Sequence, residues 1–186
     1  MTLVPIDEYR IFTVRDFLSP DECAAHIAFA EDQGFDVAPI TTGLGFVVNT
    51  DVRDNSRVMV DDAGLAEQLW DRVREFIPTP LFGWEAVGLN ERFRYYRYDP
   101  GQKFRPHFDG SFERGHREKS LLTLMVYLND GYVGGQTKFD TDRKRFVTPV
   151  AGSALVFWHQ QLHEGAPVER GRKYVLRTDV MYRRAT

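Results

Sequence analysis

The sequence predicts a mainly β domain with supporting helices, an α+β chain in which helices pack on an antiparallel barrel or sandwich. Two helical patterns occur before residue 84, and from Trp84 onward apolar and polar residues alternate with period two between closely spaced glycines. The chain has 186 residues, of which 42% are hydrophobic, as in one globular domain. We expect a single domain over residues 1–186, with mostly helical support in 1–83 and a barrel in 84–182.

The first helix is expected over residues 20–33. Ser19 precedes Pro20 and is followed three residues later by Glu22, the pattern of a capping box with proline at the first helical position. Gly34 supplies the stop. A second helix is expected to begin near Asp61 or Asp62 and to end before Pro78. Its apolar residues recur at helical spacing: Leu65, Leu69, Val73 and Phe76.

The strands are expected in the second part of the chain. The alternating segment 93–98 ends at an Asp-Pro-Gly turn, which marks the end of a strand. Four further segments alternate in the same way: 121–128, 145–150, 153–158 and 173–182. Short strands separated by glycine turns are typical of antiparallel sheets that close on a core.

Composition and charge exclude several classes of protein. No apolar run reaches 18 residues and the first residues lack a secretory pattern, so we expect no membrane span and a cytoplasmic location. The single cysteine, Cys23, excludes an internal disulfide framework. Residues 1–86 carry a charge of −10 and residues 87–186 carry +7, yet no basic run of five to eight residues occurs. Nucleic acid is therefore not the expected partner.

A possible metal site is indicated by His107, Asp109 and His163. On extended backbone, residues two apart share a face, so His107 and Asp109 can converge on one point. His163 follows 54 residues after Asp109, in an expected loop between strands. Two histidines and one carboxylate on one face of a metal are typical of non-haem Fe(II) oxygenases. The alternative is that His107 is a strand histidine whose ring nitrogens are hydrogen-bonded within the protein, and that Asp109 is a turn residue before Gly110.

Wider motifs favour the metal interpretation. The segment Tyr98-Asp-Pro-Gly-Gln-Lys-Phe-Arg-Pro-His107-Phe-Asp109 resembles the prolyl 4-hydroxylase group of Fe(II)/2-oxoglutarate dioxygenases. Further matches follow in order at 124–129, 134–139, 149–157, 163–165 and 171–174. The resemblance covers about residues 50–182. It implies a double-stranded β-helix, that is, a jelly-roll barrel with iron at its open end.

The resemblance also implies roles for individual residues. His107, Asp109 and His163 match the iron ligands, and Lys173 matches the cation that anchors the distal carboxylate of 2-oxoglutarate. A carboxylate taken into a barrel needs such a cation. Three more positions match residues on the cosubstrate side: Tyr98, Tyr127 and Thr137. The alternative for the two tyrosines is packing in the core.

Arg177 departs from the pattern, since a small residue is expected there in the related hydroxylases. It lies four residues beyond Lys173 and therefore on the same side of a strand. It is a second candidate for the 2-oxoglutarate anchor or a contact for an anionic substrate; the alternative is an ion pair with Asp179. Arg57 lies in a segment that resembles the substrate channel of the group, and its alternative is a solvated loop. His159 is interpreted as a supporting residue.

The function that the resemblance implies is an Fe(II)- and 2-oxoglutarate-dependent oxygenase. It would use O2 to hydroxylate an unactivated C–H bond, give succinate and CO2, and take ascorbate as a supporting reductant. The expected substrate is a prolyl peptide or protein, a free amino acid or a small carboxylate metabolite. Two alternatives stay open: a cupin-type metal-dependent enzyme without 2-oxoglutarate, and a non-catalytic barrel that binds a ligand. The sequence leaves the oligomeric state open.

Overall fold

The computed structural model describes residues 1–38, 40–42, 45–47, 49–139 and 145–184. Its helices are α1 (Pro20–Gln33), α2 (Ala63–Val73) and the short 3-10 helix η1 (Arg74–Phe76). Ser19 and Glu22 form the expected capping box on α1, and the side chain of Asp62 accepts a hydrogen bond from the N–H of Leu65 at the start of α2. Both predicted helices are confirmed. Among the described residues, no helix is long and apolar enough to cross a membrane.

Ten strands form one large sheet, in the order β1-β2-β15-β11-β18-β8-β6-β3, with β10 paired to β11 and β7 to β18. Their bounds are β1 (Thr2–Asp7), β2 (Ile11–Arg15), β3 (Asp36–Val37), β6 (Ser56–Asp61), β7 (Trp84–Leu89), β8 (Arg92–Tyr98), β10 (Glu113–Arg114), β11 (Glu118–Tyr127), β15 (Ala154–Trp158) and β18 (Lys173–Arg184). All the pairings are antiparallel.

A smaller sheet has four strands in the order β14-β13-β16-β9. Its strands are β9 (Phe104–His107), β13 (Thr137–Phe139), β14 (Arg145–Val147) and β16 (His163–Gly165). Two two-stranded sheets complete the fold: β12 (Val133–Gly134) with β17 (Val168–Arg170), and β4 (Ile40–Thr42) with β5 (Gly45–Val47). The mainly β fold with supporting helices is confirmed, although the large and small sheets are not hydrogen-bonded into one closed barrel in the described residues.

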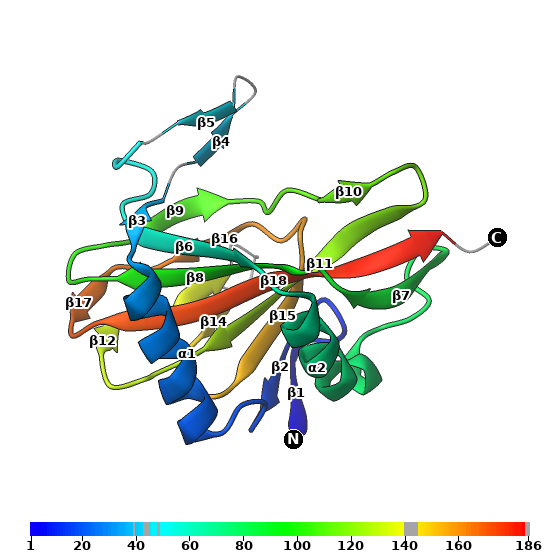
Figure 1. The fold of residues 1–186 in the computed structure, drawn as a ribbon, viewed down its shortest axis with the longest axis horizontal. Coiled ribbons are helices and arrows are strands. Elements are labelled where there is room, and N and C mark those ends of the chain that lie inside the picture. Colours follow the sequence, from blue (N-terminus) through cyan, green and yellow to red (C-terminus); the bar gives the residue numbers. More distant parts are fainter. Residues whose placement is uncertain (39, 43–44, 48, 140–144, 185–186) are drawn as a thin grey trace.

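The large sheet separates two layers of core. Helices α1 and α2 cover one of its faces, and the β4–β5 pair projects from the body (Figure 1). Because side chains alternate along a strand, Tyr95 of β8 and Leu176 of β18 pack in the core with residues of the helices. Tyr96 and Val175, their neighbours in sequence, face the second core, which also contains Phe139 of the small sheet. This alternation places every second residue of β8 and β18 between the two sheets.

The expectation that residues 1–83 are mostly helical is wrong. Strands β1 and β2 precede α1, and β6 lies between the helices. β2 pairs with β15, and β6 pairs with β8, so both extend the large sheet by contacts with residues far along the chain. A local pattern reveals helix caps, but it does not reveal such long-range pairing.

Gly152 joins the segment between β2 and α1 to the end of β11. Its N–H donates to the carbonyl of Tyr127 at 2.8 Å, and its carbonyl accepts from the N–H groups of Phe17 and Leu18 at 3.0 and 2.9 Å. Its φ is +74°, and a Cβ there would lie 2.2 Å from the carbonyl oxygen of Leu18. Only glycine fits this backbone without displacement.

Gly152→Ala is therefore expected to lower the free energy of unfolding by about 2–4 kcal/mol, because it adds strain and a backbone clash. The thermal midpoint should fall by roughly 5–15 °C. Gly131→Ala is the control, since a Cβ there meets no atom within 4 Å. Equal midpoints for the two variants in thermal unfolding followed by circular dichroism would contradict this account.

Candidate active site

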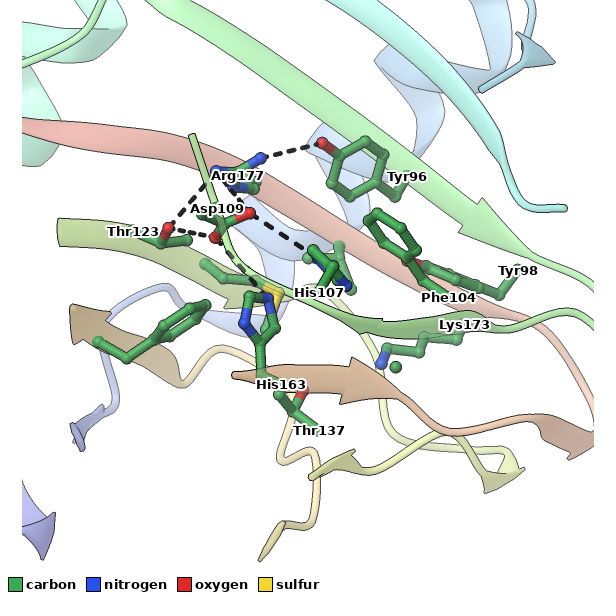
Figure 2. A pocket seen from close by; sticks show the side chains of 14 residues that line it. Tyr96, Tyr98, Phe104, His107, Asp109, Thr123, Thr137, His163, Lys173 and Arg177 are labelled. Atoms are coloured by element: carbon green, nitrogen blue, oxygen red, sulfur yellow. Dashed lines mark hydrogen bonds and ion pairs between the residues drawn. The ribbon is translucent and has the colours of Figure 1, made fainter. Parts of the chain in front are cut away.

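His107, Asp109 and His163 meet at one end of the space between the sheets. His107 is the last residue of β9 and pairs directly with His163, the first residue of β16. Each residue offers one ligand atom, and these atoms lie within 4.8 Å of one another. The Nε2 atoms of His107 and His163 are 3.8 and 3.7 Å from the carboxylate oxygens of Asp109 (Figure 2). The expected convergence is found, with His163 at the start of a strand rather than in a loop.

Backbone carbonyls orient both imidazole rings. The Nδ1 of His107 is 2.7 Å from the carbonyl oxygen of Arg105, and the Nδ1 of His163 is 2.9 Å from that of Gln161. Because a carbonyl oxygen can only accept, each Nδ1 carries the proton and each Nε2 keeps a free lone pair. Both free lone pairs belong to the atoms that face Asp109. This is the tautomer that a metal ligand needs.

The ionisation states also suit a metal. Burial lowers the pKa of His107 to about 3, with a further contribution from His163, and burial likewise lowers the pKa of His163. Burial alone would raise the pKa of Asp109, but Arg177 and the two imidazoles hold it well below its usual range. Two neutral imidazoles and one carboxylate are the forms that bind a divalent cation. The three residues therefore fit a metal with the open positions of a facial triad.

Arg177 and Thr123 fix the carboxylate of Asp109. The hydroxyl of Thr123 donates to Oδ2 of Asp109 at 2.5 Å, and Nη2 of Arg177 lies 3.1 Å from Oδ1 (Figure 2). The same Nη2 is 3.1 Å from Oδ1 of Asp179, which is the ion pair expected as the alternative for Arg177. Arg177 lines the same cavity as Lys173, as their spacing on β18 predicts, but it lies at the metal end.

Lys173 forms the other end of this cavity. Its side chain is 3% exposed, and its Nζ donates to the carbonyl of Gly135 at 2.6 Å. The Nζ lies 5.3 Å from the ring centre of Tyr98 and 5.4 Å from that of Tyr127, and the described residues include no acidic partner for it. A buried ammonium without a counter-ion is a ready partner for an incoming carboxylate.

Two hydroxyl groups lie beside this lysine. Tyr127 and Thr137 are buried, and their hydroxyl oxygens are 2.7 Å apart. Burial raises the pKa values of Tyr98 and Tyr127, so both phenols stay neutral and keep their protons. One cavity is thus lined by the metal-binding group at one end and by Lys173, Tyr98 and Thr137 at the other, and Tyr127 lies behind Thr137. This arrangement fits a keto acid that chelates a metal and places its far carboxylate on Lys173.

The pKa of Lys173 predicts how binding of 2-oxoglutarate, the cosubstrate that the resemblance implies, depends on pH. Burial lowers this pKa to about 7, so the free protein loses the ammonium charge as the pH rises through 7. A dicarboxylate needs the charged form, so its affinity should be constant below about pH 7 and fall by up to tenfold per pH unit above it. Anaerobic titrations at several pH values measure this slope. Lys173→Arg, which stays charged throughout, should abolish the slope; an unchanged slope in this variant would assign it to another group.

The substrate-side prediction, Arg57, is half-buried and lines an open cleft beside the metal-binding group. Three residues of this region were not predicted as site residues: Arg94, Tyr96 and Thr123. Arg94 and Tyr96 alternate with Tyr98 on β8, which is a signal that sequence alone contains. Phe104 stacks on His107 with ring centres 3.5 Å apart, a contact that depends on tertiary packing.

His159 lies outside the three-residue metal group. It is buried, and its Nε2 is 3.7 Å from a carboxylate oxygen of Asp179. Its carbonyl accepts from the N–H of Asp109 at 3.2 Å. The backbone of His159 thus lies beside Asp109, and a supporting role for its imidazole stays a prediction.

Comparisons with known proteins agree with this geometry. Residues 93–178 match the family model of the 2OG-Fe(II) oxygenase superfamily. The chain is 28% identical to prolyl 4-hydroxylase 1 of Arabidopsis thaliana over 191 residues, which cover 89% of this chain and 66% of that protein. It is 24% identical to a putative prolyl 4-hydroxylase of Acanthamoeba polyphaga mimivirus over 88% of the chain and 71% of that protein. The chain spans about two thirds of the length of the curated relatives it matches.

Solved structures show the same fold. The viral collagen prolyl hydroxylase of Paramecium Bursaria Chlorella virus-1, in its 2OG complex, matches with a TM-score of 0.67 at 23% identity, covering 95% of this chain and 97% of that one. A prolyl hydroxylase of Trichoplax adhaerens, in complex with a hypoxia inducible factor peptide fragment, matches with a TM-score of 0.71 at 17% identity, covering 94% and 84%. The expected double-stranded β-helix is thereby confirmed.

Proposed function

Because this chain is a 2OG-Fe(II) oxygenase of the prolyl 4-hydroxylase-like group, we propose that it hydroxylates a prolyl residue of a peptide or protein. The observation that carries the oxygenase chemistry is that one cavity is lined by both the metal-binding group and Lys173, which is buried and has no acidic partner among the described residues. The similarity to prolyl hydroxylases supports the prolyl substrate. The proposed reaction converts substrate, O2 and 2-oxoglutarate into hydroxylated substrate, succinate and CO2.

In this proposal, His107, Asp109 and His163 hold Fe(II) through the two Nε2 atoms and one carboxylate oxygen. When bound, the iron and the keto acid supply the oxidation of the C–H bond, which protein side chains alone do not perform. Thr123 and Arg177 keep Asp109 in place by occupying its oxygens with a hydrogen bond and an ion pair. Oriented ligands of this kind bind a metal more tightly.

Lys173 is proposed to bind the far carboxylate of 2-oxoglutarate, with a hydroxyl from Tyr127 or Thr137 as a second donor. Tyr98 closes the cavity beside them. The aromatic rings exclude water, which strengthens the charge interaction with Lys173. Arg177 is not proposed as the anchor, because Asp109 and Asp179 already neutralise it at the metal end.

The same cavity argues against the two alternatives. A cupin-type enzyme that uses no keto acid has no need for a buried ammonium group at the end of its metal cavity. A ligand-binding module without catalysis has no need for two imidazoles held as neutral metal-ready tautomers. The charged and oriented groups serve both a metal and a dicarboxylate.

A coupled turnover assay tests the proposed function. The protein is incubated with Fe(II), 2-oxoglutarate, ascorbate and prolyl peptides, and succinate and the peptide masses are measured. We expect succinate in equal amount to a peptide product that is one oxygen atom heavier. The matched control is each peptide with alanine in place of proline. If succinate formation is coupled to hydroxylation of a free amino acid while every prolyl peptide stays unchanged, the prolyl substrate is contradicted, whereas the assignment as an oxygenase still holds.

A further inference from the structure

A second, open cleft adjoins the metal cavity and shares five lining residues with it: Tyr96, Phe104, His107, Asp109 and Arg177. Five arginines line this cleft: Arg53, Arg57, Arg92, Arg94 and Arg177. A substrate that reaches the metal from this side passes these cations. The charge that the cleft presents therefore depends on which of them are already neutralised.

Three of the five arginines have acidic partners. Arg92 forms a two-pronged ion pair with Asp61 at 2.8 and 2.9 Å. Arg94 and Arg177 share Asp179, with distances of 3.2 and 3.1 Å to its two carboxylate oxygens. Arg177 also pairs with Asp109 at 3.1 Å, so acidic groups neutralise these three arginines and a surplus of positive charge comes from the other two.

Arg53 has no acidic partner among the described residues and is only 5% exposed. Its guanidinium carbon lies 4.5 Å from the ring centre of Tyr96 and 4.4 Å from that of Phe104, so the group is held between two rings. Its Nε donates to the side-chain oxygen of Asn55 at 2.7 Å, whereas its Nη2 is buried without a hydrogen-bond partner. A fixed, desolvated donor that lines a cleft is a site for an acceptor on a ligand.

Arg57 is the second cation without an acidic partner in the described part of the chain. Burial, together with Arg53 and Arg94, lowers its pKa. The surplus charge also affects Tyr96: burial alone would raise the pKa of this phenol, but Arg53, Arg177 and Arg94 bring it to about 8. Neighbouring arginines thus contribute to both shifts, whereas burial is the larger cause of the lowered pKa of Arg57.

We propose that Arg53 and Arg57 bind a carboxylate of the substrate, adjacent to the residue that is hydroxylated. Guanidinium groups match carboxylates in shape and charge, and a desolvated cation gains most from such a partner. The Arg53 guanidinium packs on Phe104, which stacks on His107, so this carboxylate would lie close to the metal. The inference rests on the proposed function and narrows it to acidic prolyl substrates, in which aspartate or glutamate flanks the proline.

Anaerobic binding tests this inference without turnover. Dye-labelled peptides with one proline flanked by aspartates, or by asparagines at the same positions, are titrated with protein containing Fe(II) and 2-oxoglutarate, and fluorescence anisotropy is followed. We expect the aspartate peptide to bind at least about tenfold more tightly, as a charge-assisted hydrogen bond allows. Arg57→Gln and Arg53→Gln should each remove most of this preference.

The matched control is Arg92→Gln combined with Asp61→Asn, which removes two charges of opposite sign from the same rim and should keep the preference. Equal affinity of the two peptides for the unmodified protein, or failure of both to bind, overturns the inference. So does a preference that survives in both single arginine variants. A further arm compares the affinity for a free amino acid with the affinity for its amide. If the protein distinguishes this pair but not the two peptides, the bound carboxylate belongs to a small acid, and a peptide substrate is contradicted. If the aspartate peptide binds more tightly but no prolyl peptide is hydroxylated, the proposed reaction is refuted, whereas the carboxylate site at Arg53 and Arg57 still holds.

Discussion

His107→Ala and Asp109→Ala are each expected to abolish iron binding and succinate formation. Each change removes one of three protein ligands, and Asp109→Ala also removes the only negative charge of the group. Replacing residues that merely orient metal ligands commonly costs ten- to hundredfold in affinity, so loss of a ligand should cost more than about hundredfold. Iron content after desalting and succinate release with 2-oxoglutarate measure the two effects.

The control for this prediction is His159→Gln. His159 is also a buried histidine near Asp109, but its imidazole lies outside the metal group. It should retain iron binding within about tenfold. Full turnover by both the His107 and Asp109 variants, or equal loss of iron in His159→Gln, would contradict the assignment of the three ligands.

Lys173→Ala should mainly weaken 2-oxoglutarate binding. The variant leaves the far carboxylate of the keto acid buried without a cation, and removal of one partner of such a pair costs about 2–5 kcal/mol. The dissociation constant for 2-oxoglutarate should therefore rise at least about thirtyfold, with iron binding unchanged. An anaerobic titration of the iron-loaded variant measures this constant.

Lys138→Ala provides the matched control, because Lys138 lies on β13 next to Thr137 and its side chain is 51% exposed. It should bind 2-oxoglutarate normally. Lys173→Met separates loss of charge from loss of volume, and should behave like Lys173→Ala. If the Lys173 variants need no higher concentration of 2-oxoglutarate, Lys173 does not bind its far carboxylate. Arg177, which lies on the same side of β18, would then be the candidate.

Much of the fold was predictable because its signals are local. The Ser19 cap and the Asp62 region mark helix starts through side chains only three residues from the groups they bind. Strands β2 and β6 were missed because their pairing with β15 and β8 joins segments far apart in sequence, and β1 is part of the sheet only through its pairing with β2. The alternation on β8 and β18 predicted which side chains share a face, but not what lies opposite them.

The site shows the same division between local and tertiary information. The spacing of His107 and Asp109 on extended backbone indicates that they converge, and the structure brings His163 beside them. The hydrogen bond from Thr123 to Asp109 and the packing of Arg53 between Tyr96 and Phe104 follow from sheet-to-sheet packing. Arg177 illustrates the limit best: its face was predictable, whereas its two acidic partners decide its role.

An anaerobic visible-absorption titration tests the central claim most directly. The metal-free protein receives Fe(II) and then 2-oxoglutarate, with His107→Ala run beside it. We predict a weak charge-transfer band that needs both additions and is missing in the variant, because the keto acid must chelate an iron held by His107, Asp109 and His163. A protein that binds iron but forms no band on addition of 2-oxoglutarate would contradict the account and favour a metal-dependent barrel that uses no keto acid.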